Sequence, residues 1–216
     1  IPADPEHFVV VIRTPDLVVK ALRYLMSCAP GAVGDDLLAG GTVAPLIDNV
    51  VDFAVAGNAQ GLLLTTVETD GPGWAVWRYS ASSMGGGVAS KVLLASRMKQ
   101  PEDLSMSTDG KLIVWREAAD VLLVASAPPA PLAVPGGAAS LFLTRVDQQP
   151  FLFWTAPAGG GVFAALLNPD GKLATAVAVA PPGHAMAHVA GSQGGMALIT
   201  SEIGCADCRP GHTSRS

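Results

Sequence analysis

Three residues near the C-terminal end have the types and spacing of a metal site. Cys205 and Cys208 form a C-x-x-C pair, and His212 follows four positions later. A tight turn can bring two such thiolates to one side, where they share a tetrahedral zinc ion with a histidine. The same cysteines could instead form a disulfide or remain inert thiols, which we expect ahead of zinc binding or redox catalysis. Candidates for a fourth zinc ligand are His184, His188 and Cys28.

Ser192 lies in the segment Ala190–Gly194, which resembles the nucleophile elbow of α/β-hydrolases. That elbow places its serine on a sharp turn between a strand and a helix, and the acid and histidine follow later in the chain. Here the one Asp and the one His that follow are Asp207 and His212, close to the end. We therefore expect a turn between two strands and no catalytic role, although Ser192 is the nucleophile that a hydrolase would use.

Four aromatic residues could form a ligand surface: Trp74, Trp77, Tyr79 and Trp115. All four fall in apolar segments predicted as strands. Alternation along a strand places Trp77 and Tyr79 on one face and Trp74 on the other. An exposed group of such rings suits carbohydrate or partner binding. Packing in the core is the alternative that we favour.

The composition indicates a folded chain and excludes one class of partner. Half of the residues are hydrophobic and 14% are charged, and the mean hydropathy is +0.40. No apolar run reaches the ~20 residues of a spanning helix, so we expect no transmembrane segment. The net charge is −5, and the 13 basic residues are scattered. Nucleic-acid binding needs a concentrated basic face, and we exclude it.

From Val51 onward, short apolar runs alternate with clusters of Gly, Pro, Asn and Asp, which is typical of many short strands joined by tight turns. Four segments share a small residue, an apolar stretch and an acid seven positions after the start, as an internal repeat would. They are Gly61–Glu68, Gly110–Glu117, Ser140–Asp147 and Gly195–Glu202. The predicted fold class is mainly β and antiparallel, either propeller-like or a sandwich, with an N-terminal βα segment.

The predicted βα segment consists of a strand at His7–Ile12 and a helix after it. Thr14 can cap a helix, Pro15 suits its first position, and apolar residues follow at helical spacing up to Leu25. We divide the chain into this segment at residues 1–50, packed on the main domain, a β-rich domain with repeats at 51–204, and a tail at 205–216.

The function indicated is that of a non-catalytic binding or scaffold protein. The sequence carries no nucleophile with evident partners and no cofactor fingerprint, so we expect no cofactor, with zinc at the C-terminal cysteines and histidine as the alternative. The high apolar fraction favours a protein partner or self-association, as in a subunit of a larger assembly. We expect a location outside the cytoplasm. The alternative is a hydrolase that uses Ser192 or a metal held by the C-terminal cysteines and histidine.

Overall fold

The protein folds almost entirely into β-strands. A computed structural model describes residues 2–4, 7–25, 27, 31, 33–39, 47–58, 61–82, 86–118, 120–124, 128–147, 149–192 and 195–202. These residues contain no α-helix and a single 3-10 turn, η1 (Pro157–Gly159). No helix that could span a membrane is present in this described part of the chain.

In the part of the chain that the structure describes, the strands form five antiparallel sheets, and four of these have four strands each in chain order. The first sheet contains β1 (Pro2–Asp4), β2 (His7–Arg13), β3 (Val19–Leu25) and β4 (Asp35–Asp36). The second contains β5 (Val50–Asn58), β6 (Gly61–Asp70), β7 (Gly73–Ser82) and β8 (Val88–Arg97). The third contains β9 (Glu102–Met106), β10 (Ile113–Glu117), β11 (Asp120–Val124) and β12 (Ala130–Leu132).

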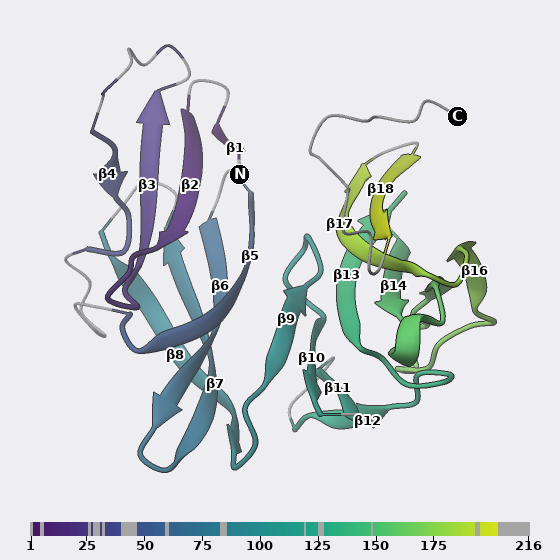
Figure 1. Cartoon of the computed structure of the whole chain (residues 1–216). Helices are drawn as coiled ribbons and strands as arrows, with labels where there is room; N and C mark the ends of the chain where they lie inside the picture. Colours follow the sequence, from purple (N-terminus) through teal and green to yellow (C-terminus); the bar gives the residue numbers. More distant parts are fainter. Residues whose placement is uncertain are drawn as a thin grey trace.

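The fourth sheet contains β13 (Ser140–Val146), β14 (Gln149–Thr155), β15 (Val162–Leu166) and β16 (Val177–Ala180). The last sheet, which we call the terminal sheet, has two strands, β17 (His184–Ser192) and β18 (Gly195–Glu202). The first strand of each sheet contacts the first strand of the next: β1 contacts β5, β5 contacts β9, β9 contacts β13, and β13 contacts β17. The four larger sheets therefore form a propeller-like ring of blades, with the terminal sheet beside the fourth (Figure 1).

The core lies between neighbouring sheets because alternate side chains of a strand point to opposite faces. In β10, Ile113 and Trp115 pack against the second sheet, and Val114 packs against the fourth. Three of the four interfaces are well filled, with 12, 11 and 9 buried residues. At the interface between the fourth and terminal sheets, 2 buried residues are found among those whose side chains the structure describes, which exclude residues 188–197 and 201–202.

These observations confirm the mainly β, antiparallel and propeller-like prediction, whereas the predicted helix was wrong. The segment expected to be helical is β3, which pairs with β2 along its whole length from His7↔Leu25 to Arg13↔Val19. Thr14 caps a hairpin turn and not a helix, because its hydroxyl forms hydrogen bonds with the backbone of Val18. Pro15 fits the second position of such a turn as well as a helix start, and pairing with β2 decides between the two.

Three of the four matching segments occupy equivalent places in the fold. They form β6, β10 and β18, the second strands of their sheets, whereas Ser140–Asp147 covers the first strand of the fourth sheet. In the second and third sheets the acid that ends this segment, Glu68 or Glu117, is buried, whereas Asp147 of the fourth sheet is exposed. Glu68 accepts hydrogen bonds from the hydroxyls of Thr66 and Tyr79, each at 2.6 Å. Glu117 accepts one from Nε1 of Trp115 at 2.8 Å.

Two buried tryptophans provide a matched test of this acid's role. Trp115 and Trp154 are both fully buried, but Nε1 of Trp154 has no hydrogen-bond partner among the described residues. Trp115→Phe removes a satisfied bond, and Trp154→Phe removes an unsatisfied donor. We expect Trp115→Phe to lower the free energy of unfolding by about 1–2 kcal/mol more than Trp154→Phe. Urea unfolding followed by circular dichroism tests this, and equal losses would contradict it.

Candidate functional site

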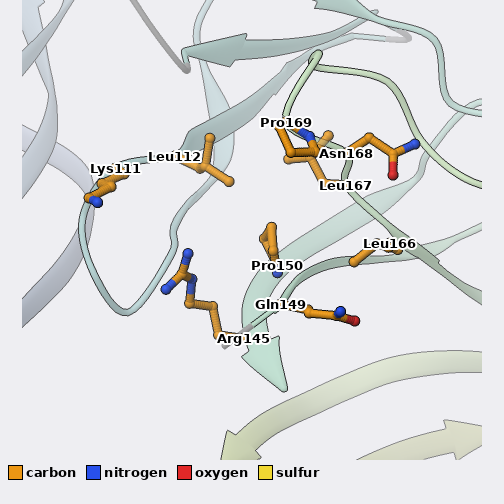
Figure 2. A pocket seen from close by; sticks show the side chains of 9 residues that line it. All are labelled: Lys111, Leu112, Arg145, Gln149, Pro150, Leu166, Leu167, Asn168 and Pro169. Carbon is orange, nitrogen blue, oxygen red and sulfur yellow. The ribbon is translucent and has the colours of Figure 1, made fainter. Parts of the chain in front are cut away.

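A pocket of about 380 Å³ opens where turns of the third and fourth sheets meet. Its wall comes from the β9–β10 turn, the β13–β14 hairpin and the segment that follows β15. Figure 2 shows the cationic side chains of Lys111 and Arg145 on one side, with the prolines and leucines beside them. The lining residues are Lys111, Leu112, Arg145, Gln149, Pro150, Leu166, Leu167, Asn168 and Pro169.

Two turns of the same design shape this pocket. In Ser107–Gly110 the glycine N–H donates to the Ser107 carbonyl at 2.7 Å, and in Asn168–Gly171 the glycine donates to the Asn168 carbonyl at 3.0 Å. Gly110 and Gly171 have φ of +70° and +79°, a conformation that glycine adopts readily. Each glycine follows an aspartate and precedes a lysine. The sequence Asp-Gly-Lys therefore places Lys111 at the exit of its turn.

Arg145 is positioned by Asp109. Its Nη2 lies 3.2 Å from Oδ2 of Asp109. Burial alone would raise the pKa of Asp109, but hydrogen bonds from the Ser107 hydroxyl and the Lys111 N–H, with the charges of Arg145 and Lys111, hold that pKa below its usual value. The carboxylate is therefore ionised at neutral pH. From the opposite side, Nη2 of Arg78 donates to the Gly110 carbonyl at 2.7 Å, so the turn is fixed from two sheets.

The pocket can accept an anion with an apolar body. Lys111 and Arg145 contribute two positive charges and Asp109 one negative charge, so these three residues carry a net charge of +1 in a chain of net charge −5. The remaining wall is mostly leucine and proline, with the amides of Gln149 and Asn168. Ligand pockets typically combine such apolar walls with a few polar groups in 300–1,000 Å³.

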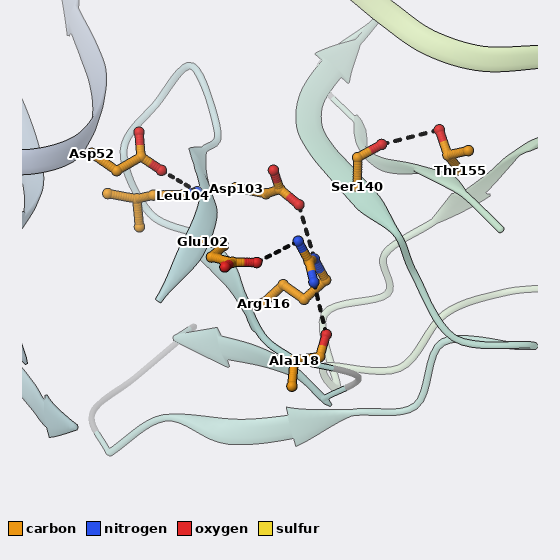
Figure 3. Close-up of polar contacts among 8 residues, drawn as sticks. All are labelled: Asp52, Glu102, Asp103, Leu104, Arg116, Ala118, Ser140 and Thr155. Atoms are coloured by element: carbon orange, nitrogen blue, oxygen red, sulfur yellow. Dashed lines mark hydrogen bonds and ion pairs between the residues drawn. The ribbon is translucent and has the colours of Figure 1, made fainter. Parts of the chain in front are cut away.

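A second polar group lies near the first strands of the sheets (Figure 3). Arg116 of β10 joins Glu102 and Asp103 of β9, with nitrogen–oxygen distances of 2.6 Å and 3.0 Å, and also donates to the Ala118 carbonyl at 2.8 Å. The Ser140 hydroxyl lies 3.0 Å from that of Thr155. Thr155 in turn accepts the backbone N–H of Met186 at 3.0 Å, which ties the terminal sheet to the fourth.

Asp52 ties the second sheet to the third. Its carboxylate accepts the backbone N–H of Phe53 at 2.8 Å and of Leu104 in β9 at 2.9 Å. Burial raises the pKa of Asp52, and the nearby charge of Asp103 adds to this, against the two backbone hydrogen bonds. A raised carboxylate pKa in a cleft can indicate an acid catalyst. Here the bonds join neighbouring sheets, which favours a structural role.

The structure distributes the four predicted aromatic ligand residues between two buried clusters. Tyr79 is 1% exposed and packs with Trp77 between the first and second sheets. Trp115 is 0% exposed and packs near Trp74 between the second and third. The opposite facing of Trp74 and Trp77 was predicted correctly. Nζ of Lys91 covers the Trp77 ring at 4.3 Å from its centroid. The four residues therefore form no common exposed surface.

The residues around Ser192 form a hairpin. Ser192 pairs with Gly195 at the end of the β17–β18 ladder, and Gly195–Glu202 is a strand where an elbow needs a helix. The two strands expected on either side of this segment are therefore confirmed, and Gln193 and Gly194 between them lie outside the described residues. Cys28, Cys205, Cys208 and His212 lie outside the described residues, so the zinc and disulfide alternatives stay predictions. Within the described residues, no group of three or more His, Cys, Asp or Glu could hold a metal ion.

The sequence interpretation missed Lys111, Arg145, Gln149 and Asn168. One signal was present: the tripeptide Asp-Gly-Lys occurs twice, at 109–111 and 170–172, and it marks the two turns that shape the pocket. Arg145 carries no local signal of this kind, because its position depends on the β13–β14 hairpin reaching the turn of the preceding sheet.

Comparisons with known proteins identify no family. No family model matches the chain, and no curated protein matches it. Among solved structures, a functionally unknown protein from Desulfotomaculum acetoxidans aligns with a TM-score of 0.41 at 14% identity, over 92% of this chain and 62% of that one. The chain thus spans about 62% of the length of that structure.

Proposed function

We propose that the protein is a non-catalytic binding protein that holds a small organic anion, such as a carboxylate with an apolar tail, in the pocket between the third and fourth sheets. The observation that carries the proposal is the pairing of Lys111 and Arg145 with apolar walls in one pocket of suitable size. Arg145 already contacts Asp109, so Lys111 is the cation available to form the main new charge contact.

The alternative of a hydrolase stays a prediction. A hydrolase with a metal site would use cysteines and a histidine that lie outside the described residues. A hydrolase with Ser192 as nucleophile would lack the strand–turn–helix geometry of an elbow. The carboxylates with described contacts near the first strands bind Arg116 or backbone N–H groups. These contacts favour binding over acid–base catalysis. The extracytoplasmic location also stays a prediction.

The test uses octanoate as probe and octanol as its neutral counterpart, with affinity measured by titration calorimetry. We expect octanoate to bind more tightly than octanol. Lys111→Gln should weaken octanoate by about fivefold, since one partly exposed charge contact contributes about 1 kcal/mol. Lys99→Gln is the matched control, because Lys99 is also exposed and is not among the pocket residues. Equal binding of the two probes, or equal effects of the two variants, would contradict the proposal.

A further inference from the structure

The two carboxylate oxygens of Asp109 have different partners. Oδ1 accepts hydrogen bonds from the Ser107 hydroxyl at 2.6 Å and from the Lys111 backbone N–H at 3.2 Å, and the second of these is the bond that closes an Asx turn. Oδ2 lies 3.2 Å from Nη2 of Arg145, and the exposed fractions of the Asp109 and Arg145 side chains are 22% and 24%. One oxygen therefore fixes the turn, and the other fixes the arginine.

Asp109 lies behind the wall of the pocket. Arg145 and Lys111 are among the lining residues, whereas Asp109 is not and instead lines a separate hollow of about 280 Å³ beside the second sheet. Figure 2 shows the side chains of Arg145 and Lys111 on the same side of the pocket, so the head group of one ligand can reach both. Asp109 therefore acts on a bound anion through the charge that it places beside Arg145.

The second Asp-Gly-Lys turn has the same local bonding but a different partner at Oδ2. Oδ1 of Asp170 accepts the Lys172 backbone N–H at 3.1 Å. Its Oδ2 lies 3.8 Å from Nζ of Lys172, and these two side chains are 58% and 80% exposed. A turn of this design therefore forms without an arginine at Oδ2, so the contact of Asp109 with Arg145 is additional to the turn.

We propose that Asp109 restricts the pocket to ligands that carry a single negative charge. Of the two cations that line the pocket, Arg145 is paired with Asp109, and Lys111 remains to bind the ligand. A head group with two negative charges would bring its second charge beside an ion pair of no net charge, which would not offset the loss of solvation. The inference rests on the proposed binding function and names its ligand class, a monoanion with an aliphatic tail.

Octyl sulfate and octyl phosphate are a matched pair of probes. Their head groups have the same shape, but at about pH 8 the sulfate carries one negative charge and the phosphate close to two, because the second pKa of such a phosphate is about 6. With the wild-type protein, we expect titration calorimetry to show that octyl phosphate binds no more tightly than octyl sulfate. A wild-type preference for octyl phosphate of about fivefold, as one added charge contact would give, would overturn the proposal.

Asp109→Asn removes the charge and keeps the turn. Oδ1 of asparagine can accept the same two hydrogen bonds, and asparagine forms the same kind of turn. We expect this variant to tighten octyl phosphate relative to octyl sulfate by about fivefold, since Arg145 can then contact the second charge. Asp170→Asn is the matched control in the second turn and should leave the ratio of the two affinities unchanged.

The ratio separates a charge effect from a structural one, because a distorted pocket would weaken both probes alike. An unchanged ratio in Asp109→Asn, or an equal change in Asp170→Asn, would overturn the proposal. Asp109→Ser, which keeps a weaker acceptor in the turn, repeats the test if Asp109→Asn fails to fold. If octanoate and both octyl probes fail to bind the wild-type protein, the proposed function fails and this inference with it. Octanoate binding with an unchanged ratio overturns the inference alone.

A measurement without ligand tests the contact between Asp109 and Arg145 directly. Phenylglyoxal modifies arginine side chains, and a neighbouring carboxylate slows the reaction because it stabilises the charged guanidinium. We expect Asp109→Asn to raise the rate of modification at Arg145, followed by mass spectrometry, and Asp170→Asn to leave that rate unchanged. An unchanged rate in Asp109→Asn would overturn the proposal, because Asp109 would then not restrain the arginine.

Discussion

Replacing Glu117 with alanine is expected to lower the free energy of unfolding by about 2–3 kcal/mol, because a buried carboxylate that binds a buried donor and a 33% exposed arginine is lost. The Glu117 side chain is 6% exposed, and its oxygens lie 2.5 and 2.6 Å from Nε and Nη2 of Arg97 in the preceding sheet. It also accepts Nε1 of the buried Trp115. Alanine would leave a buried donor without its acceptor and a guanidinium without its carboxylate.

The control for this prediction is Glu102→Ala. Glu102 also pairs with an arginine, Arg116, but its side chain is 48% exposed, and exposed pairs contribute about 0–1 kcal/mol. Urea denaturation followed by circular dichroism gives both values. A loss for Glu117→Ala no larger than that for Glu102→Ala would show that the link between the second and third sheets adds little to stability.

Gly161→Ala should be comparably destabilising, for a steric reason. Gly161 has φ of +94°, and a Cβ there would lie 2.7 Å from the Ala180 carbonyl oxygen and 3.0 Å from the backbone of Pro181. Backbone atoms cannot rotate away as a side chain does, so β16 would have to move. Conformational strain of about 1–2 kcal/mol and overpacking of about 1–3 kcal/mol together predict a loss of about 3 kcal/mol.

Gly136→Ala separates the two contributions. Gly136 has φ of +75°, and a Cβ there would meet nothing within 4 Å, so that variant should show the conformational cost alone. The same urea experiment measures both. Hydrogen exchange of the β16 amides adds a local readout, because the displaced strand should exchange faster in Gly161→Ala. Equal losses in the two glycine variants would mean that the close approach of β16 is relieved without cost.

The pocket depends on charges at Lys111 and Arg145. Salt should therefore weaken octanoate binding, because screening acts on charges and not on apolar contacts. Calorimetric titration of octanoate at low and high salt tests this, and an affinity unchanged by salt would contradict it.

The sequence by itself determined the fold class. Its short apolar runs are bounded by turn residues, and runs of that length and pattern fit strands better than helices. It also located the two strands around Ser192 and the opposite facing of Trp74 and Trp77, since alternation along a strand is a local property. Asp109-Gly110 and Asp170-Gly171 marked the turns that shape the pocket. These two turns are the only feature of the candidate site that the sequence alone could predict.

The tertiary structure decided the rest. Thr14 and Pro15 fit a helix start and a hairpin turn equally well, and pairing of β3 with β2 selected the hairpin. Glu117 reads as an acid at a strand end, and only the neighbouring sheet supplies Arg97 as its partner. Arg145 reaches Asp109 across 36 positions of the chain. Each of these depends on contacts between sheets, which no local pattern encodes.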